Sequence, residues 1–172
     1  MGVLDDLKTT LAMGARANKY KVMLAAPQGP TDDTLINTIC KGGTIPAKTM
    51  GQIEVWTQGR KLVVAGDATF ENSWSLTFYN TQDLALRNAF DDWLIFIDDM
   101  NEHKRGATDH ASYMTDGAKI EQLDTSDNST KATYKFFNMW PVSISAIEMA
   151  DESIDAISEF EVEFAYSHWI KE

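Results

Sequence analysis

Residues 41–49 are the nearest match in the sequence to a nucleotide-binding motif. Gly42 is followed at the spacing of a phosphate-binding P-loop by Lys48, and in that motif backbone N–H groups and a lysine hold the phosphates. Here, however, Ala47 replaces the second glycine, and Pro46 removes one of the backbone donors. The segment that follows alternates like a strand, whereas the motif requires a helix N-terminus. The sequence therefore predicts a flexible loop that binds no nucleotide.

Two other groups of polar residues have types that bind metal ions. His103 and His110 lie near acidic residues, but no third ligand has helical or hairpin spacing to them, so an exposed polar loop is expected. Residues 124–135 begin like a calcium loop, but Ser129 replaces the required glycine and Lys135 replaces the closing glutamate. No metal or other cofactor is predicted.

The residue types of nucleophilic catalysis are also sparse. Cys40 is the single cysteine, which excludes an internal disulfide or a cysteine metal cluster, and it is expected to be a small buried residue. No serine–histidine–acid set and no pair of catalytic carboxylates has a recognisable spacing. The sequence predicts that the protein is not an enzyme, and an enzyme with a metal in the 101–118 loop remains the alternative.

Strict alternation of acidic and apolar residues marks the segment 158–169. The acidic positions are Glu159, Glu161 and Glu163, and the apolar positions are Phe160, Val162, Phe164 and Tyr166. A two-residue period predicts a strand with one buried face and one exposed face. Three neighbouring glutamates repel one another, so the exposed face is either a charged edge that resists aggregation or a wall that must be acidic.

Composition indicates one globular domain, since 172 residues at 44% hydrophobic content suffice for a full core. The net charge of −11 is uneven, because residues 1–70 hold eight Lys/Arg against six Asp/Glu and residues 71–172 hold seven against twenty. An acidic chain is a poor candidate for gripping nucleic acid, but such asymmetry suits copies that stack through unlike ends. Neither a signal peptide nor a membrane span is expected, which predicts a protein made and kept in the cytoplasm.

Most of the chain is predicted as seven to nine strands. They are expected at residues 20–25, 34–40, 53–56, 61–65, 73–79, 119–123, 130–137, from 140 onward and in 158–169. Turns are predicted at 57–60 and at Gly66–Asp67, and Pro141 predicts an edge strand or a strand start.

Two helices are predicted besides the strands. A short amphipathic helix is expected at residues 3–13. A longer one is expected at residues 81–100, capped by Asn80, with Asp83 in its first turn. Its apolar stripe should cover one side of the sheet; the stripe consists of Leu86, Phe90, Trp93, Ile97 and Met100.

Five stretches, taken together and in order, resemble the tail tube proteins of contractile-tailed bacteriophages. They are residues 40–53, residues 60–70 with 74–80, the helix with Arg87, Phe90, Asp92 and Trp93, the triplet Trp140, Pro141 and Val142, and residues 160–169. Each stretch alone is weak, but together they span about residues 15–170. The first 14 residues match only loosely.

The resemblance implies a mainly β fold with one long flanking helix. Residues 1–172 would form a single β-sandwich-like or barrel-like tail tube domain, with residues 1–14 as an N-terminal helical arm. Six copies would form a ring in which their strands join into one continuous β-barrel, and this closure would remove exposed strand edges. Rings would stack head to tail into a conduit for DNA ejection, in the tail of a virion assembled in the host cytoplasm. The implied partners are the tail sheath, baseplate and tape measure proteins, and DNA would pass without specific binding.

The resemblance also implies roles for particular residues. Glu159, Glu161 and Glu163 would line the channel, where acidic side chains keep DNA from sticking. Gly42, Gly43, Pro46 and Lys48 would belong to a loop that reaches the neighbouring ring. Phe90, Trp93, Phe160, Val162 and Phe164 would anchor the core. Two related alternatives remain: a baseplate-proximal protein that initiates the tube, and the tube protein of a contractile injection or secretion system.

Overall fold

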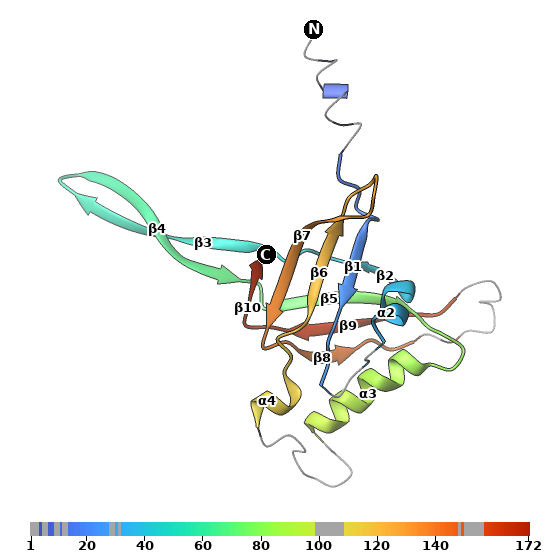
Figure 1. Cartoon of the computed structure of the whole chain (residues 1–172). Coiled ribbons are helices and arrows are strands. Elements are labelled where there is room, and N and C mark those ends of the chain that lie inside the picture. The colour runs from blue at the N-terminus through green and yellow to red at the C-terminus, as the bar shows by residue number, and fades with distance from the viewer. Residues whose placement is uncertain are drawn as a thin grey trace.

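Two four-stranded antiparallel sheets form the body of the protein in the computed structural model (Figure 1). The structure describes residues 14–27, 30, 32–98, 109–147, 149 and 157–172, with positions 4, 7, 8 and 11 before them. The β1 sheet has the order β1 (Tyr20–Met23), β6 (Lys119–Leu123), β7 (Thr130–Phe137) and β10 (His168–Lys171). The β9 sheet has the order β2 (Cys40–Gly43), β5 (Ser73–Tyr79), β9 (Glu159–Ala165) and β8 (Trp140–Ile144).

These sheets agree with the mainly β prediction. The strands predicted at 73–79, 119–123 and 130–137 are confirmed with the same bounds, and the strand with Pro141 lies at a sheet edge as predicted. Within the described residues both sheets are open, and no closed barrel forms in the single chain. In the same part of the chain, no helix has the length and apolar character needed to cross a membrane.

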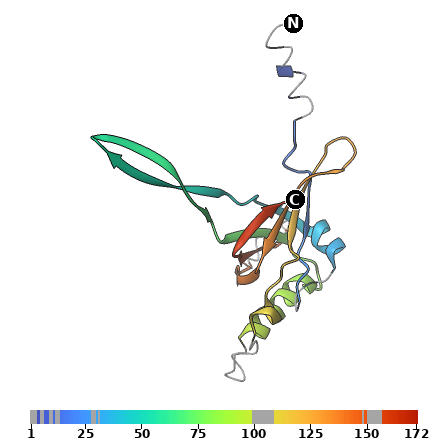
Figure 2. The ribbon, with the colours of Figure 1, turned by 60° about the vertical axis from the view of Figure 1, so that its left-hand side comes forward.

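A third sheet, the hairpin of β3 (Lys48–Thr57) and β4 (Arg60–Phe70), projects from the body as an arm (Figures 1 and 2). Its turn has positive φ at Gln58 and Gly59, 49° and 76°, as a two-residue hairpin turn with the twist of its strands requires. The hairpin was predicted, but it is much longer than expected. The predicted turn at Gly66–Asp67 is wrong, because both residues lie within β4.

One hydrophobic core lies between the two sheets and beneath helix α3 (Ala85–Ile97). Alternate residues of the central strands β5 and β9 supply its largest part, because a strand turns every second side chain to the same face. The residues that are at most 2% exposed include Trp74, Leu76, Phe78, Leu86, Phe90, Trp93, Phe136, Phe160, Val162 and Phe164. Contacts among these rings hold α3 against the β9 sheet.

Helix α3 has 13 residues and begins four residues later than predicted. Leu84, the residue before the helix, has a left-handed conformation with φ of 51°. It closes a turn over residues 81–84, in which the Leu84 N–H donates to the carbonyl of Thr81 at 3.0 Å. Asp83 accepts a 3.3 Å hydrogen bond from the backbone N–H of Ala85. Asn80 does not cap the helix: its Nδ2 donates to Ser158 Oγ at 2.9 Å. The predicted end at Met100 lies outside the described residues.

The predicted strand at residues 34–40 is wrong, because this segment forms helix α2 (Asp33–Ile39), which leads directly into β2. Asp32 stabilises its start, since its carboxylate accepts the backbone N–H groups of Thr34 and Leu35 at 3.0 and 3.1 Å. Ile36 is fully buried and holds the helix on the core.

The segment predicted as one strand at 158–169 is two strands in different sheets. β9 ends at Ala165 and β10 begins at His168. Between them, Tyr166 is only 3% exposed, and its ring lies 5.2 Å from that of Phe136. The chain therefore crosses from one sheet to the other at a buried residue. A further helix, α4 (His110–Tyr113), is a single short turn. The predicted helix at residues 3–13 lies mostly outside the described residues.

Candidate channel and assembly surfaces

The outer face of the β9 sheet carries a row of carboxylates next to a row of hydroxyls. In the antiparallel pairing of β5 with β9, Ser75 lies opposite Glu163, Thr77 opposite Glu161, and Tyr79 opposite Glu159. Directly opposed residues share a face, and the alternate residues of both strands fill the core. The three glutamates therefore lie together on the face away from the core, and we call this surface the acidic face.

The three glutamates have different surroundings. Glu159 forms an ion pair with Lys41, whose Nζ lies 2.6 Å from Oε2 and donates a hydrogen bond to it. This hydrogen bond raises the pKa of Lys41 above its usual value. Glu163 accepts from Ser73 Oγ at 2.7 Å and from Ser143 Oγ at 3.4 Å. Glu161 is exposed and lies between the other two. Its charge is the least compensated.

A shallow hollow of about 150 Å³ lies on the acidic face between β5, β8 and β9. Its lining consists of hydroxyls and carboxylates only: Ser75, Ser143, Ser145, Glu161 and Glu163. Such a surface repels anions and is well hydrated, but it lacks the ligand density of a cation site. Across the described part of the chain, no three His, Cys, Asp or Glu residues are grouped to hold a metal. His103 lies outside that part, and His110 Nδ1 lies 2.8 Å from the hydroxyl of Tyr113.

Aromatic residues on the inner side of β9 fix the position of the acidic face. Phe90 of α3 packs with ring centroids 5.9 Å from Phe164 and 6.4 Å from Phe160. Trp93 lies 6.5 Å from Phe164, and its Nε1 donates to the carbonyl of Tyr113 at 2.9 Å. The residues expected to anchor the core, which also include Val162, are all at most 2% exposed.

The residues expected in an inter-ring loop lie at the base of the arm. Gly42 and Gly43 belong to β2, an edge strand of the β9 sheet. Pro46 is buried between β2 and β3. Lys48 is the first residue of β3, and its ammonium lies 5.4 Å from the ring centroid of Phe70. These four residues therefore share one region, but they are not at the tip.

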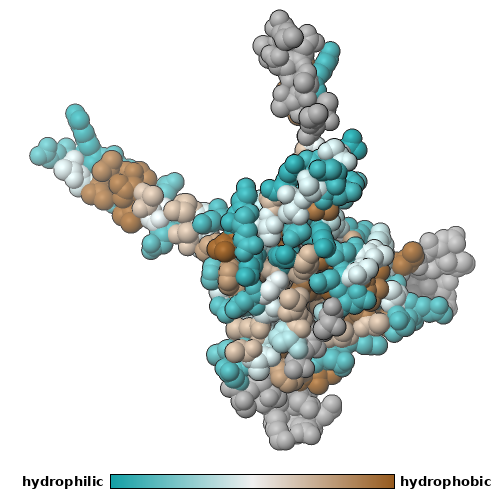
Figure 3. All heavy atoms as spheres, viewed as in Figure 1, coloured by the Kyte–Doolittle hydropathy of each residue, from teal (hydrophilic) through white to brown (hydrophobic). Residues whose placement is uncertain are grey.

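The arm exposes apolar side chains that sequence reasoning did not single out (Figure 3). One face of the hairpin carries four aliphatic residues at 40–60% exposure: Ile53, Val55, Leu62 and Val64. We call this the aliphatic face. The opposite face carries an ion pair between Lys61 and Glu54, and Lys61 lies over the ring of Trp56 at 6.0 Å. The alternation of apolar and polar residues in β3 and β4 was the sequence signal for this face. Such alternation usually indicates a face buried in the core of the same chain.

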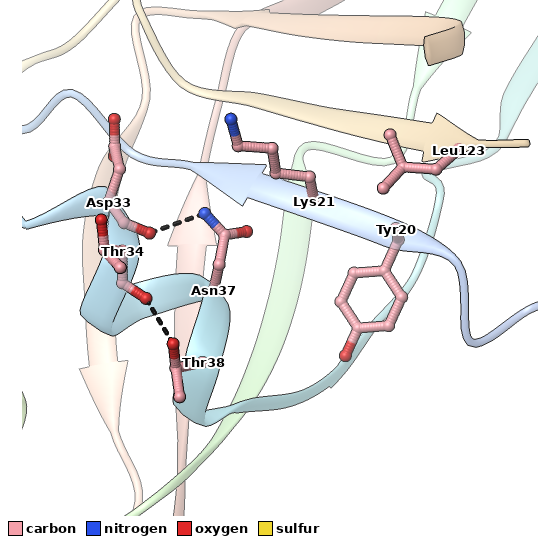
Figure 4. Close-up of a pocket in the computed structure, with 7 residues that line it drawn as sticks. All are labelled: Tyr20, Lys21, Asp33, Thr34, Asn37, Thr38 and Leu123. Atoms are coloured by element: carbon pink, nitrogen blue, oxygen red, sulfur yellow. Dashed lines mark hydrogen bonds between the residues drawn. The ribbon is translucent and has the colours of Figure 1, made fainter. Parts of the chain in front are cut away.

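A groove of about 410 Å³ separates α2 from β1 and Leu123 (Figure 4). Its polar groups are largely used within the helix, because Asn37 Nδ2 donates to the carbonyl of Asp33 at 2.6 Å and Thr38 Oγ1 to that of Thr34 at 2.7 Å. These polar groups do not converge on a common point. The groove is a gap between packed elements and has no arrangement for chemistry.

Cys40 and Tyr20 form a small contact between β2 and β1. The hydroxyl of Tyr20 donates to the carbonyl of Cys40 at 2.9 Å, and burial, followed by the nearby Cys40, raises the pKa of Tyr20 to about 12. Burial also raises the pKa of the Cys40 thiol, which therefore remains protonated and weakly nucleophilic at neutral pH. This pair links two strands and offers no reactive group.

Comparison with known proteins gives the same family along most of the chain. The family model described as phage tail tube protein matches residues 15–172. The tail tube protein gp19 of Enterobacteria phage T4 is 27% identical over 130 residues, which cover 76% of this chain and 78% of that protein. The corresponding protein of Enterobacteria phage T6 is 26% identical over the same length.

Solved structures share the fold at low sequence identity. A chain in the cryo-EM structure of an anti-feeding prophage cap, which terminates the tube, superposes with a TM-score of 0.63 at 10% identity and covers 92% of this chain and 91% of that chain. A chain in the sheath–tube complex of an extracellular contractile injection system gives 0.60 at 13% identity, with 95% and 96% covered. Because the family match extends over nearly the whole chain, the protein belongs to the phage tail tube protein family and has a structural role in the tail tube.

Proposed function

We propose that this protein assembles into stacked hexameric rings that form the inner tail tube, the conduit for DNA ejection, and that the acidic face lines its channel. The observation that carries the proposal is the segregation of β9. Its inner side is buried against α3, whereas its outer side presents three carboxylates and Ala165, with hydroxyls beside them. A sheet that is fixed on one side and polar on the other is suited to a channel wall.

Repulsion is the function we assign to the carboxylates. DNA carries about one negative charge per 1.7 Å of axis and binds surfaces that replace its counterions with lysine or arginine. Six copies with three glutamates each would present about eighteen carboxylates around one ring, offset in part by Lys41. Such a wall offers no phosphate contacts, so the duplex can slide through without being held.

Closure of the ring would use the edges of the β9 sheet. β2 and β8 are its edge strands, and pairing β8 of one copy with β2 of the next would continue the sheet around the ring. That pairing would form the continuous barrel that a single chain lacks, and it would remove both open edges. Gly42, Gly43, Pro46 and Lys48 would then lie where the arm leaves the barrel toward the next ring.

The remaining partners follow from a place in a contractile tail. The outer surface of the tube would contact the tail sheath, one end the baseplate, and the channel the tape measure protein before DNA. The protein would be a component of the virion, assembled in the host cytoplasm, with no catalytic function of its own.

A second candidate is the tube of a contractile injection system, whose cargo is protein. The match over 95% of the chain to a sheath–tube complex of such a system favours it, whereas the curated relatives are phage proteins. A baseplate-proximal tube initiator is a third form of the same role. Copy number in the particle separates the initiator from the main tube protein, and the presence of DNA separates virion from injection device.

Charge reversal of the acidic face tests the leading proposal. Changing Glu159, Glu161 and Glu163 together to lysine leaves the buried side of β9 intact, so tubes should still form. These tubes should retain DNA, more weakly at high salt, and particles built with them should eject their genome slowly. The triple glutamine variant is the control and should assemble without retaining DNA. Normal ejection from the lysine particles, or lysine side chains found on the outer surface of the tube, would refute the proposal.

A further inference from the structure

Lys41 is the only basic residue within the four strands of the β9 sheet, which also carry the three glutamates of the acidic face. Its side chain is 45% exposed, and its Nζ lies 2.7 and 2.6 Å from the two carboxylate oxygens of Glu159. The ammonium also lies over the ring of Tyr79 on β5, 5.7 Å from the centroid. Lys41 therefore lies along the acidic face and reaches across β5 to β9, two strands from its own strand.

A β-bulge in β2 gives Lys41 this position. Cys40 pairs with Phe78 of β5. The neighbouring position of β5, Thr77, pairs with Gly42, so Lys41 is the extra residue of the bulge. A bulge can re-aim a side chain, and Gly42 places no side chain beside it. Because Cys40 packs on the core, the residue after it faces the other side of the sheet.

Closure of the ring through β8 and β2 would put Lys41 midway between two rows of glutamates. The strand order β2, β5, β9, β8 places β9 two strands from β2 within one copy. If β8 of the next copy pairs with β2, the β9 strand of that copy is also two strands from β2, on the other side. Both separations are about 9–10 Å at the usual strand spacing. Neighbouring strands of the sheet are antiparallel, so β8 runs opposite to β2 and the pairing would continue the same pattern.

The neighbouring row of glutamates has no charged side chain between it and Lys41 in this arrangement. β8 is the strand between them, and none of its five residues is charged. Its residue opposite Glu163 is Ser143, whose hydroxyl is much shorter than the phenol ring that Lys41 crosses within its own copy. Glu161 and Glu163 also line the hollow beside β8. An ammonium has three N–H donors, and Glu159 can accept two of them, so one donor is left for the neighbouring row.

We propose that Lys41 bridges adjacent copies in the ring: it keeps Glu159 of its own copy and donates its third N–H to Glu161 or Glu163 of the neighbouring copy. The inference rests on the proposed function and adds the residue that offsets the repulsion between glutamate rows when the sheet closes. Without Lys41, closure would bring these rows together with no cation on the strands between them. With it, each junction between copies gains a charge-assisted hydrogen bond.

Zero-length cross-linking of assembled tubes tests the contact directly. A carbodiimide activates a carboxylate, which then forms an amide with an amine in contact with it, while the carbodiimide takes up the water and leaves as a urea. Tubes are assembled from a mixture of unlabelled and nitrogen-15-labelled subunits. Peptide mass spectrometry should then find Lys41 joined to Glu161 or Glu163 in pairs of mixed label, which only two different chains can give. Unassembled subunits should give only the product of Lys41 with Glu159 of the same chain.

Substitutions separate the two contacts of Lys41. Lys41→Gln should raise the subunit concentration needed for ring and tube formation at low salt by about three- to fivefold, the upper part of the range for a partly exposed ion pair. Lys41→Arg keeps the cation and should restore most of this loss. Lys21→Gln removes the same charge from the β1 sheet and is the matched control, which should assemble like the parent. At 1 M salt, where the screening length is about 3 Å, the effect of Lys41→Gln should nearly vanish.

The background in which Lys41→Gln is made identifies its partner. In a Glu159→Gln protein the contact within the copy is already lost, so Lys41→Gln should still raise the concentration needed for assembly. In a protein with both Glu161→Gln and Glu163→Gln the contact between copies is lost, and Lys41→Gln should then have little further effect. Thermal unfolding of the unassembled variants shows whether each subunit is folded before assembly is compared.

The outcomes separate this inference from the proposed function. Tube formation that is unaffected by Lys41→Gln, a loss that disappears in the Glu159→Gln background, or parent tubes in which Lys41 is joined only to Glu159 of the same chain would overturn the bridge and leave the tube function intact. If Lys41→Gln unfolds the subunit, the cross-linked pair in parent tubes decides. A parent protein that forms no rings or tubes under any condition would overturn the function and the inference together.

Discussion

Removing the central charge of the acidic face should stabilise the single subunit, and the size of the gain can be worked out. Glu161 has a glutamate two residues away on either side, at about 7 Å along a strand. In water each such pair of charges repels by about 0.6 kcal/mol. At 0.01 M salt, where the screening length is about 30 Å, most of this repulsion remains. Glu161→Gln should therefore stabilise the folded subunit by at most about 1 kcal/mol.

The other two glutamates provide the internal controls. Glu159→Gln removes one repulsion but also the ion pair with Lys41, and Glu163 has only one glutamate neighbour and accepts from Ser73 and Ser143. Both substitutions should stabilise less than Glu161→Gln, or destabilise. Among the three, the central position is expected to give the largest gain because it has two like neighbours and no cation bound to it in the structure.

Thermal unfolding of the unassembled subunit measures this effect. For a chain of this size, 1 kcal/mol corresponds to roughly 2–4 °C in melting temperature. The protein should be kept dilute, and sedimentation velocity should verify that it is monomeric. At 1 M salt, where the screening length is about 3 Å, the difference between Glu161→Gln and the parent should nearly vanish. A loss of stability in Glu161→Gln, or a gain that salt does not alter, would refute the electrostatic reasoning.

Three further predictions concern the stability of the subunit. Trp93→Ala should lower the free energy of unfolding by about 3–5 kcal/mol, and Trp93→Phe should cost less while still removing the bond to Tyr113; urea titration of both variants would show whether α3 is packed as described. Asp32→Ala should cost about 1 kcal/mol through loss of the α2 cap, whereas Asp32→Asn should restore most of it in the same titration. The N–H of Ser126, and then Lys131, lower the pKa of Asp124; its stabilisation is thus present above the unfolded pKa of about 4 and lost as pH falls through the folded value. Stability measured from pH 5 down to pH 2 should fall less steeply in Asp124→Asn than in the parent, and equal slopes would contradict this assignment.

The alternation of apolar and polar residues correctly predicted the strands in which it is strict. It failed in a short apolar run that has no clear period. β5 and β9 alternate over seven residues each, so their buried sides followed from the sequence. The run Leu35–Ile39 is too short to separate helix from strand. Asp32 was the available helix signal, because an N-cap residue precedes the run at the spacing that its carboxylate requires.

In the arm, the alternation of apolar and polar residues did not reveal what the apolar face packs against. Ile53 and Val55 alternate with polar residues as they would on a half-buried strand, yet no core of the same chain receives them. Both side chains are exposed in the single chain, so the alternation indicated an apolar face but not a core to cover it. The crossing from β9 to β10 was missed for a similar reason: Tyr166 continues the alternation, and only packing against Phe136 shows that the chain changes sheets there.

The last described residues also have a mechanical consequence. β9 carries the acidic face, and β10 carries Trp169 and His168, which clamp Phe70 at the base of the arm. The connection between these strands contains only Tyr166 and Ser167, and the first of them is immobilised in the core. A short connection with one residue buried in the core is expected to couple the base of the arm to both sheets. In a tube assembled as proposed, with the arms reaching the next ring and the acidic face lining the channel, a force transmitted through the arms would load the channel wall directly.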